Sequence, residues 1–222
     1  MCIRDSSCTV RIHCRPAIPI IASKVLNEPP TLHLASTSPR RREILATLGL
    51  DFDVVPVDVD ESPQHGESPA AMVVRLAIAK ARAAEIDAGG VALGSDTAVV
   101  LDDHVLGKPR DEADCLRMLD LLSGRVHQVL TGVALCGPEG PATALSETDV
   151  YFREIGRDEA RSYWQSGEPR DKAGAYAIQG LGGAFVERIE GSYSGVVGLP
   201  VFETIHLLRA AGIEVLANQA KR

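Results

Sequence analysis

From Thr31 onward, segments with the periodicity of β-strands alternate with segments with the periodicity of helices, and this alternation restricts the fold more than any other feature. Strands interleaved with helices of this length are typical of an α/β protein. The sequence therefore predicts an α/β fold. The expected strands are 31–35, 52–57, 91–93, 98–101, 126–135, 143–152 and 184–189, and the expected helices are 40–48, 69–88, 111–122, 157–166 and 200–211.

Local signals support several of these boundaries. Ser68 is a favourable N-cap, with Pro69 at the first helical position. The polar run 94–97 is expected to be a turn between two short strands, and 137–141 a turn between two longer ones. The chain of 222 residues has no internal repeat and no interdomain linker. We therefore expect one domain over residues 31–222, large enough to be built as two lobes.

The first 30 residues differ from the rest of the chain. They combine Cys, Arg and Pro with one short apolar stretch at 17–22, which Pro19 interrupts, and this disfavours a signal peptide. The Cys and His residues of this segment have no second ligand pair at zinc-site spacing. Residues 1–6 read like the translation of a transposon-end sequencing adapter, so our hypothesis is a non-native tail outside the domain. An independent genomic clone encoding the same six residues would contradict it.

Charge and cysteine usage exclude several kinds of partner. The chain has 30 acidic and 23 basic side chains and a net charge of −7, which repels the backbone of duplex nucleic acid. No apolar run approaches the ~20 residues that a membrane helix needs. Five cysteines without paired spacing fit a reducing compartment. We expect a cytoplasmic protein that binds neither duplex nucleic acid nor a membrane.

The junction between the first strand and the first helix carries groups that can bind an anion. Ser36 and Ser38 supply hydroxyls there, and Arg40, Arg41 and Arg42 follow at the start of the helix. A helix N-terminus offers free N–H groups and partial positive charge, and Arg binds phosphate oxygens in a bidentate fork. Arg in a first helical turn opposes the helix dipole. We therefore favour anion binding over a row of merely solvated arginines.

Four further positions carry charges suited to such a site, each with a simpler alternative. Glu61 ends an acidic stretch that either holds Mg²⁺ or forms a solvated loop. Lys80 lies on the apolar side of its helix, either reaching a phosphate or snorkelling to solvent. Asp96 follows an apolar strand, as a metal ligand or general base, or as part of a polar turn. The sequence around Lys108 does not match a Walker A loop, but its ammonium group can still neutralise a phosphate.

Residues 166–180 form a stretch rich in Gly and Ala, interrupted by polar side chains. This composition fits close backbone approach to a ligand, and a tight structural loop equally well. Within it, Gln179 has an amide that can read the edge of a base. Neither a Ser-His-Asp arrangement nor a metal site built on His or Cys spacing can be identified.

Together, these segments resemble the Maf family of nucleoside triphosphate pyrophosphatases over nearly all of residues 31–212. Many ordered matches along one chain make the resemblance specific, although several would be weak singly. In chain order the matching segments are 34–41, 60–61, 80–81, 96–97, 107–109, 122–124 with His127, 131–133, 167–169, 171–174, 178–180 and 197–200.

The resemblance implies a Maf/ITPase-like mixed sheet flanked by helices, with two lobes around a central cleft that takes a nucleoside triphosphate. It implies a divalent cation, Mg²⁺ or Mn²⁺, held by Glu61 and Asp96, with Asp96 as the proton acceptor that prepares the attacking water. It also brings the expectation of a homodimer, of a house-cleaning role against non-canonical nucleotides and of a link to cell-division arrest. The implied triphosphate ligands are Arg40, Arg41, Lys80, Lys108, Ser36 and Ser38.

Three positions indicate a substrate branch within the family. Thr97, Lys172 and Gln179 match the branch that prefers dTTP and UTP, whereas Ser95 differs from the Ala more usual there. We expect Arg40, Thr97 and Gln179 to set base choice, because an amide reading a pyrimidine edge rejects a methylated purine by size and pairing. The alternatives are a 7-methyl-GTP pyrophosphatase, and a nucleotide-binding regulator of cell division without turnover.

Overall fold

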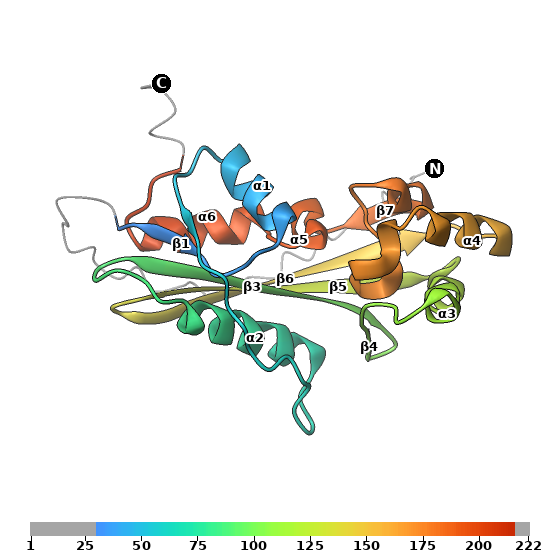
Figure 1. The fold of residues 1–222 in the computed structure, drawn as a ribbon, viewed down its shortest axis with the longest axis horizontal. Helices are drawn as coiled ribbons and strands as arrows, with labels where there is room; N and C mark the ends of the chain where they lie inside the picture. The colour runs from blue at the N-terminus through green and yellow to red at the C-terminus, as the bar shows by residue number, and fades with distance from the viewer. Residues whose placement is uncertain (1–29, 216–222) are drawn as a thin grey trace, which may run out of the picture.

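The computed structural model describes residues 30–215, in which the chain folds around one mixed sheet of seven strands (Figure 1). The strand order is β2-β1-β3-β5-β6-β7, and β4 pairs with part of β3. Pairing is parallel between β1 and its two neighbours and antiparallel elsewhere. The strands are β1 (Leu32–Leu34), β2 (Asp53–Val54), β3 (Val91–Leu101), β4 (His104–Leu106), β5 (Val126–Gly137), β6 (Gly140–Phe152) and β7 (Val186–Glu190).

Strand β3 has different partners along its two halves. On one edge, β1 pairs with residues 91–93 and β4 with residues 99–101. On the other edge, β5 pairs with residues 92–100. On the first edge, residues 94–98 lie between these two pairings and have no partner among the described strands, although β5 pairs with them on the other edge. This opening leaves the middle of a buried strand accessible to groups from the helices and loops around it.

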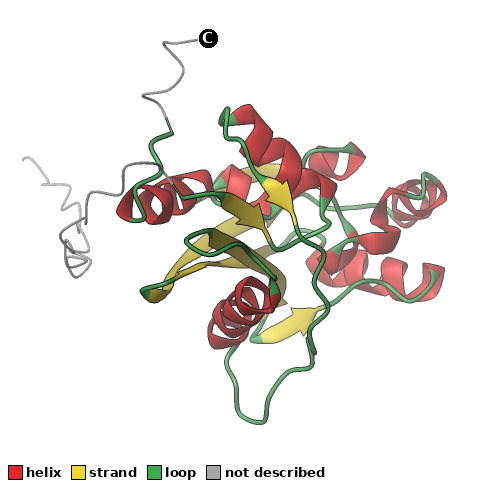
Figure 2. Cartoon of the chain, turned by 60° about the vertical axis from the view of Figure 1, so that its left-hand side comes forward, coloured by secondary structure: helices red, strands yellow, loops and turns green. Residues whose placement is uncertain are grey.

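Helices cover both faces of the sheet. Helix α2 lies on one face, and α1, α5 and α6 lie on the other (Figure 1, Figure 2). Helices α3 and α4 gather with three short 3₁₀ helices at one end of the long strands (Figure 1). None of the helices within residues 30–215 is long and apolar enough to cross a membrane. The helices are α1 (Pro39–Thr47), α2 (Pro69–Ala83), α3 (Glu112–Leu122), α4 (Arg157–Gln165), η1 (Glu168–Asp171), η2 (Ala173–Ala175), η3 (Leu181–Phe185), α5 (Tyr193–Val197) and α6 (Val201–Ala210).

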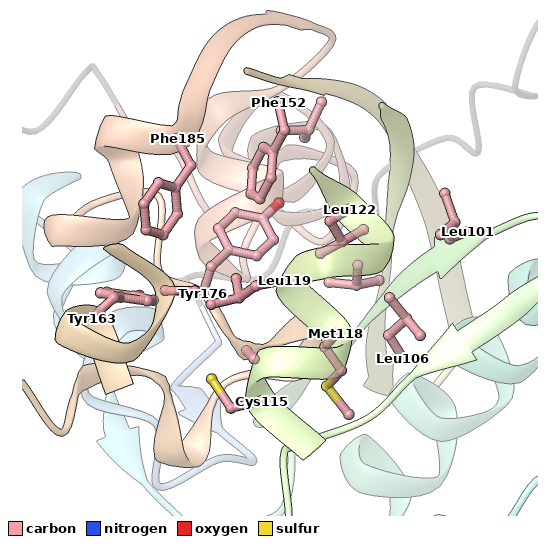
Figure 3. Close-up of a cluster of buried hydrophobic side chains, with 14 of the residues drawn as sticks. Leu101, Leu106, Cys115, Met118, Leu119, Leu122, Phe152, Tyr163, Tyr176 and Phe185 are labelled. Atoms are coloured by element: carbon pink, nitrogen blue, oxygen red, sulfur yellow. The ribbon is translucent and has the colours of Figure 1, made fainter. Parts of the chain in front are cut away.

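Buried side chains form two main groups at the two ends of the sheet. One group packs around α3 and α4 and includes Tyr163, Tyr176 and Phe185 (Figure 3). The other packs β1, β3 and β5 against α1 and α6, and smaller groups lie under α2. Strand β3 serves both, because Leu93 belongs to one group and Val99 to the other. The expected mixed sheet flanked by helices is confirmed, and its two cores form two lobes joined by the long strands.

The structure corrects several expected boundaries. The turn expected at 94–97 is wrong, because β3 runs unbroken through it while β5 supplies a continuous partner. Helix α2 ends at Ala83 rather than near Ala88, and the strand expected at 52–57 is limited to Asp53–Val54. Strand β4, helix α5 and the 3₁₀ helices were not expected. The predicted N-terminal tail lies, apart from its last residue, outside the described residues.

Candidate active site

A cavity of about 430 Å³ opens between the two lobes, at the stretch of β3 that lacks a partner on one edge. Ten residues that the sequence suggested for a site line this cavity, although they come from segments far apart in the chain. Arg42, the third arginine of its run, is exposed on α1 and does not line it. The ten are Ser36, Ser38, Arg40, Arg41, Glu61, Lys80, Asp96, Thr97, Lys108 and Gln179.

Helix α2 approaches β3 closely because a glycine lies at the contact. A Cβ atom at Gly94 would lie 2.7 Å from the backbone nitrogen of Ala81, closer than real side chains come. This approach brings Lys80 Nζ to 2.7 Å from Asp96 Oδ1 and 2.5 Å from Glu61 Oε1. Lys80 therefore does not snorkel to bulk solvent, and its ammonium group joins the two carboxylates that the sequence suggested as metal ligands.

The two carboxylates have different environments. Burial raises the pKa of Asp96 above its usual value, although the charges of Lys80 and Arg41 oppose the shift. Burial acts in the same direction on Glu61, but the hydrogen bond and charge of Lys80 outweigh it and lower the pKa of Glu61. Asp96 is therefore the more basic of the pair, and a buried carboxylate of raised pKa that faces a cavity is suited to accept a proton.

The start of α1 presents a fixed guanidinium group. Arg41 Nε donates to the carbonyl oxygen of Gly198 at 2.9 Å, and its Nη1 donates to Ser36 Oγ at 3.2 Å. Burial lowers the pKa of Arg41, and the negative charge of Asp96 opposes that shift. Ser38 is the N-cap residue of α1 but makes no capping bond with its side chain. The first turn of the helix therefore keeps N–H groups that an anion can use.

Hydroxyl groups on β3 and β5 hold α5 over the cavity. Ser95 Oγ donates to the carbonyl oxygen of Gly198 at 3.0 Å, so this oxygen receives bonds from both Ser95 and Arg41. Thr131 Oγ1 lies 2.8 Å from the carbonyl oxygen of Gly195 and 3.1 Å from Thr97 Oγ1. These contacts orient Thr97 and Arg41, and the unusual Ser95 has a structural role in this chain.

Two loops of the other lobe contribute the remaining charges. Lys108 is exposed in the loop after β4, and the carbonyl oxygen of its neighbour Gly107 accepts a bond from Gly174 N at 3.0 Å. Asp171 pairs with Lys172 and lies 4.0 Å from Arg40 of the first lobe. The hydrogen bond from Lys172 lowers the pKa of Asp171, with burial opposing. Charged groups from both lobes thus meet across the cavity.

The donor set of the site fits a divalent cation that shares its ligands with a substrate. Within residues 30–215, no group of three His, Cys, Asp or Glu side chains could hold a metal ion. Each of the two carboxylates, Asp96 and Glu61, directs one oxygen to Lys80 and keeps a second one. Mg²⁺ is commonly bound through one or two carboxylates, with water and substrate phosphates completing the shell.

Sequence reasoning missed parts of the site that carry no residue-type signal. The carbonyl oxygen of Gly198 is one, because any residue has such an oxygen. Tyr176 is another: it lines the cavity, and its hydroxyl lies 2.8 Å from Nε2 of the buried His127, far away in sequence. Burial lowers the pKa of His127 to about 4, so this ring is neutral at neutral pH. Asp171 could have been found, because it lies inside one of the matched segments.

Known proteins resemble this chain over most of its length. The sequence pattern of the family described as Maf-like protein matches residues 31–211. The dTTP/UTP pyrophosphatase of Vibrio parahaemolyticus is 53% identical over 181 residues, which are 81% of this chain and 96% of that protein. The dTTP/UTP pyrophosphatase of Saccharophagus degradans is 54% identical over 194 residues, 85% and 92% of the two chains. Among solved structures, a HAM1 protein from Coxiella burnetii aligns with 58% of this chain and 74% of its own, at 23% identity and a TM-score of 0.41.

Proposed function

Because the chain belongs to the Maf-like protein family, we propose that it is a nucleoside triphosphate pyrophosphatase that hydrolyses dTTP and UTP to the monophosphate and pyrophosphate. Two relatives at 53% and 54% identity bear this activity in their names. The observation that carries the proposal is the buried Asp96, bound to Lys80 in a cavity lined with cations. The cavity volume of about 430 Å³ lies in the range usual for small-molecule sites.

The triphosphate would be bound by the positive charges around the cavity. Arg40 and Arg41 supply guanidinium groups from α1, and Lys80 and Lys108 supply ammonium groups. The hydroxyls of Ser36 and Ser38 and the free N–H groups at the start of α1 add uncharged donors. Charge gathers on the phosphate oxygens in the transition state, so cations already fixed in place stabilise that state more than the ground state.

Asp96 would act as the proton acceptor for an attacking water molecule. The water oxygen bonds to the α-phosphorus, the bond from this phosphorus to the α–β bridging oxygen breaks, pyrophosphate leaves with that oxygen, and the proton of the water goes to Asp96. The raised pKa of Asp96 favours this role, and Lys80 keeps the carboxylate in position through its bond of 2.7 Å. Direct attack by water needs no covalent intermediate with the protein.

A divalent cation, Mg²⁺ or Mn²⁺, would be held by Asp96 and Glu61 through the oxygens that remain beside Lys80. When bound, it supplies positive charge to the phosphate oxygens and lowers the pKa of a bound water. Lys80 occupies the region between the two carboxylates and keeps their charges from repelling each other when no cation is present.

Base choice would depend on Arg40, Thr97 and Gln179, which line the same cavity. Thr97 is oriented by Thr131, and Gln179 offers both an amide donor and an acceptor for a pyrimidine edge. Together, these three side chains would make the enzyme prefer pyrimidine nucleotides. Hydrolysis of 7-methyl-GTP alone, or binding without turnover by a cell-division regulator, are the two alternatives to be tested.

The remaining parts of the proposal concern the molecule as a whole. We expect a single domain over residues 31–222, a cytoplasmic location, free nucleotides as partners rather than duplex nucleic acid or a membrane, and a homodimer. The family resemblance adds a role against non-canonical nucleotides and a link to cell-division arrest to this proposal.

Pyrophosphate release from dTTP, UTP, CTP, GTP and 7-methyl-GTP, with Mg²⁺ and with EDTA, tests the proposal. We expect metal-dependent turnover of dTTP and UTP. Replacing the proton acceptor should reduce kcat by about 10²- to 10⁴-fold in Asp96→Asn, while the matched control Asp103→Asn, in an exposed turn, stays as active as the wild type. Turnover of 7-methyl-GTP alone would refute the pyrimidine roles, and equal, negligible release by both the wild type and Asp96→Asn would favour the regulator.

A further inference from the structure

The loop of residues 177–182, which includes the first two residues of η3, carries Gln179 into the cavity, and two side chains hold its backbone from both sides. Tyr163 lies on α4 and Glu168 on η1, and neither residue lines the cavity itself. Both are close in sequence to each other but separate from the loop they contact. Nothing in the reaction proposed above uses either of them.

The hydrogen bonds of this pair reach three N–H groups on both sides of Gln179. Ala177 N donates to the hydroxyl oxygen of Tyr163 at 3.1 Å, two residues before Gln179. Leu181 N donates to Glu168 Oε2 and Gly182 N to Glu168 Oε1, both at 2.9 Å, on the other side. The Tyr163 hydroxyl in turn donates to Glu168 Oε1 at 2.7 Å, which joins the two halves of the arrangement.

The environment keeps Glu168 ionised and Tyr163 protonated, as these bonds require. Burial opposes ionisation of Glu168, but the N–H groups of Gly182 and Leu181 and the Tyr163 hydroxyl outweigh it and lower its pKa. Burial, followed by the hydrogen bond to Glu168, raises the pKa of Tyr163. An ionised acceptor forms stronger bonds to backbone N–H groups than a neutral one.

Packing leaves this pair little freedom. The ring of Tyr163 is 5% exposed and stands edge-on to Phe185, with ring centres 5.0 Å apart (Figure 3). A Cβ atom at Gly180 would lie 2.6 Å from the carboxyl carbon of Glu168, so the loop can approach the carboxylate this closely only with glycine there.

We propose that Tyr163 and Glu168 form a clamp that fixes the loop 177–182 and thereby sets the position of Gln179 for base choice. The clamp residues are positioning residues, since they act on the nucleotide through Gln179. The effect of the clamp on base choice rests on the proposed function. The clamp itself can be measured without any substrate.

Substrate discrimination tests the consequence. dTTP and dCTP share the sugar and triphosphate and differ at the base edge that an amide can read. In Glu168→Gln, we expect the ratio of kcat/KM for dTTP over dCTP to fall on the order of ten-fold, mainly through KM for dTTP, because two N–H bonds lose their charged acceptor. Tyr163→Phe should act in the same direction but less. Glu159→Gln, whose carboxylate binds Arg153 instead of the loop, is the matched control and should keep the wild-type ratio.

A second variant separates positioning from a general structural effect. In a Gln179→Ala background, the discrimination by Gln179 is already lost, so adding Glu168→Gln should lower the ratio no further. Additive losses in the double variant would overturn the inference, since Glu168 would then act on the nucleotide by another route. A wild-type ratio in Glu168→Gln would overturn it as well.

Amide hydrogen exchange measures the clamp independently of turnover. We expect the amides of Leu181 and Gly182 to exchange at least ten-fold faster in Glu168→Gln than in wild type, with no change in Glu159→Gln. Unchanged exchange would refute the clamp even if the enzyme hydrolyses dTTP as proposed. If the wild type turns over no nucleotide, the proposed function fails. The ratio of the equilibrium binding constants for dTTP and dCTP then replaces the ratio of kcat/KM. An unchanged binding ratio in Glu168→Gln, or additive losses in the double variant, would overturn the clamp's role in base choice.

Discussion

The contact between α2 and β3 predicts a large effect of a single added methyl group at Gly94. A Cβ there would lie 2.7 Å from the nitrogen of Ala81, and closer still to the carbonyl oxygen of Ala77. Both atoms belong to the backbone of α2, so no side chain can rotate away to make room. Ordinary contact begins at 3.4 Å and the Ala77 oxygen would lie at only 2.2 Å, so Gly94→Ala must push α2 away from β3 by about 1.2 Å.

This displacement acts directly on the site, because Lys80 is anchored on the same helix. Its bond of 2.7 Å to Asp96 would lengthen to about 3.9 Å, beyond the distance of a hydrogen bond. Misplacing a group at a reaction centre by about 1 Å can cost ~10²-fold in rate. Overpacking of a core contact costs about 1–3 kcal/mol, which corresponds to a fall in Tm of roughly 2–12 °C for a domain of this size.

Pyrophosphate release and thermal unfolding of the same preparations measure both effects. We expect Gly94→Ala to lose about 10²-fold in kcat/KM for dTTP and to remain folded at 25 °C. The matched control is Gly156→Ala, where an added Cβ meets nothing within 4 Å and φ is −70°. Trimming Ala81 to Gly should not rescue Gly94→Ala, since the contacted atoms are backbone. A Gly94→Ala enzyme within two-fold of wild-type activity and with an unchanged Tm would refute the reasoning.

Two further predictions concern pH. Asp96 must be ionised to accept a proton, so kcat/KM should fall as pH drops through the raised pKa of Asp96. Lys80→Met removes a cation that lowers this pKa, so the fall of kcat/KM on the acidic side should move to higher pH in this variant. The same pH dependence in the wild type and in Lys80→Met would contradict Asp96 as the proton acceptor. Burial lowers the pKa of His127 from 6.5 in the unfolded chain to about 4, so the unfolded state binds the extra proton in between. The free energy of unfolding, measured in urea, should therefore decrease by up to about 3 kcal/mol as pH falls from 6.5 to 4. If a His127→Phe variant shows the same decrease, His127 is not its source.

Local sequence patterns predicted most helices and strands, but they did not predict that β3 continues through residues 94–97. The run 94–97 contains residue types typical of turns, so the sequence favoured a break there. In the structure, β5 pairs with residues 92–100 of β3 and keeps the run extended. The pairing partner lies more than 30 residues away in the chain, and local propensity contains no information about it. The correction matters for the site, because it places Asp96 in mid-strand, bound to Lys80 of α2, instead of in a turn.

Sequence reasoning named ten residues that line one cavity, but not the relations between them. Charge and residue type identified Lys80 and Glu61 as candidates, although Lys80 could have snorkelled to solvent and Glu61 could have been part of a solvated loop. Only the approach of α2 to Gly94 shows that Lys80 bridges two carboxylates. The contacts of Glu168 with the loop of Gln179 depend on backbone N–H groups, which every non-proline residue has, so no residue type signals them.

Because β3 and β5 pass through both cores, the chain cannot be divided into two modules along the cleft. A cut in the segment between residues 102 and 125 leaves β3 in one fragment and β5 in the other. Each fragment then has part of each core and part of the cleft, and the pairing of β3 with β5 over residues 92–100 must form between two chains. Such fragments are natural candidates for a split reporter, in which a site appears only when two fused proteins bring the halves together. The same connectivity means that lobes of this kind cannot be exchanged between proteins as units, and that variation has to enter through the loops at the rim.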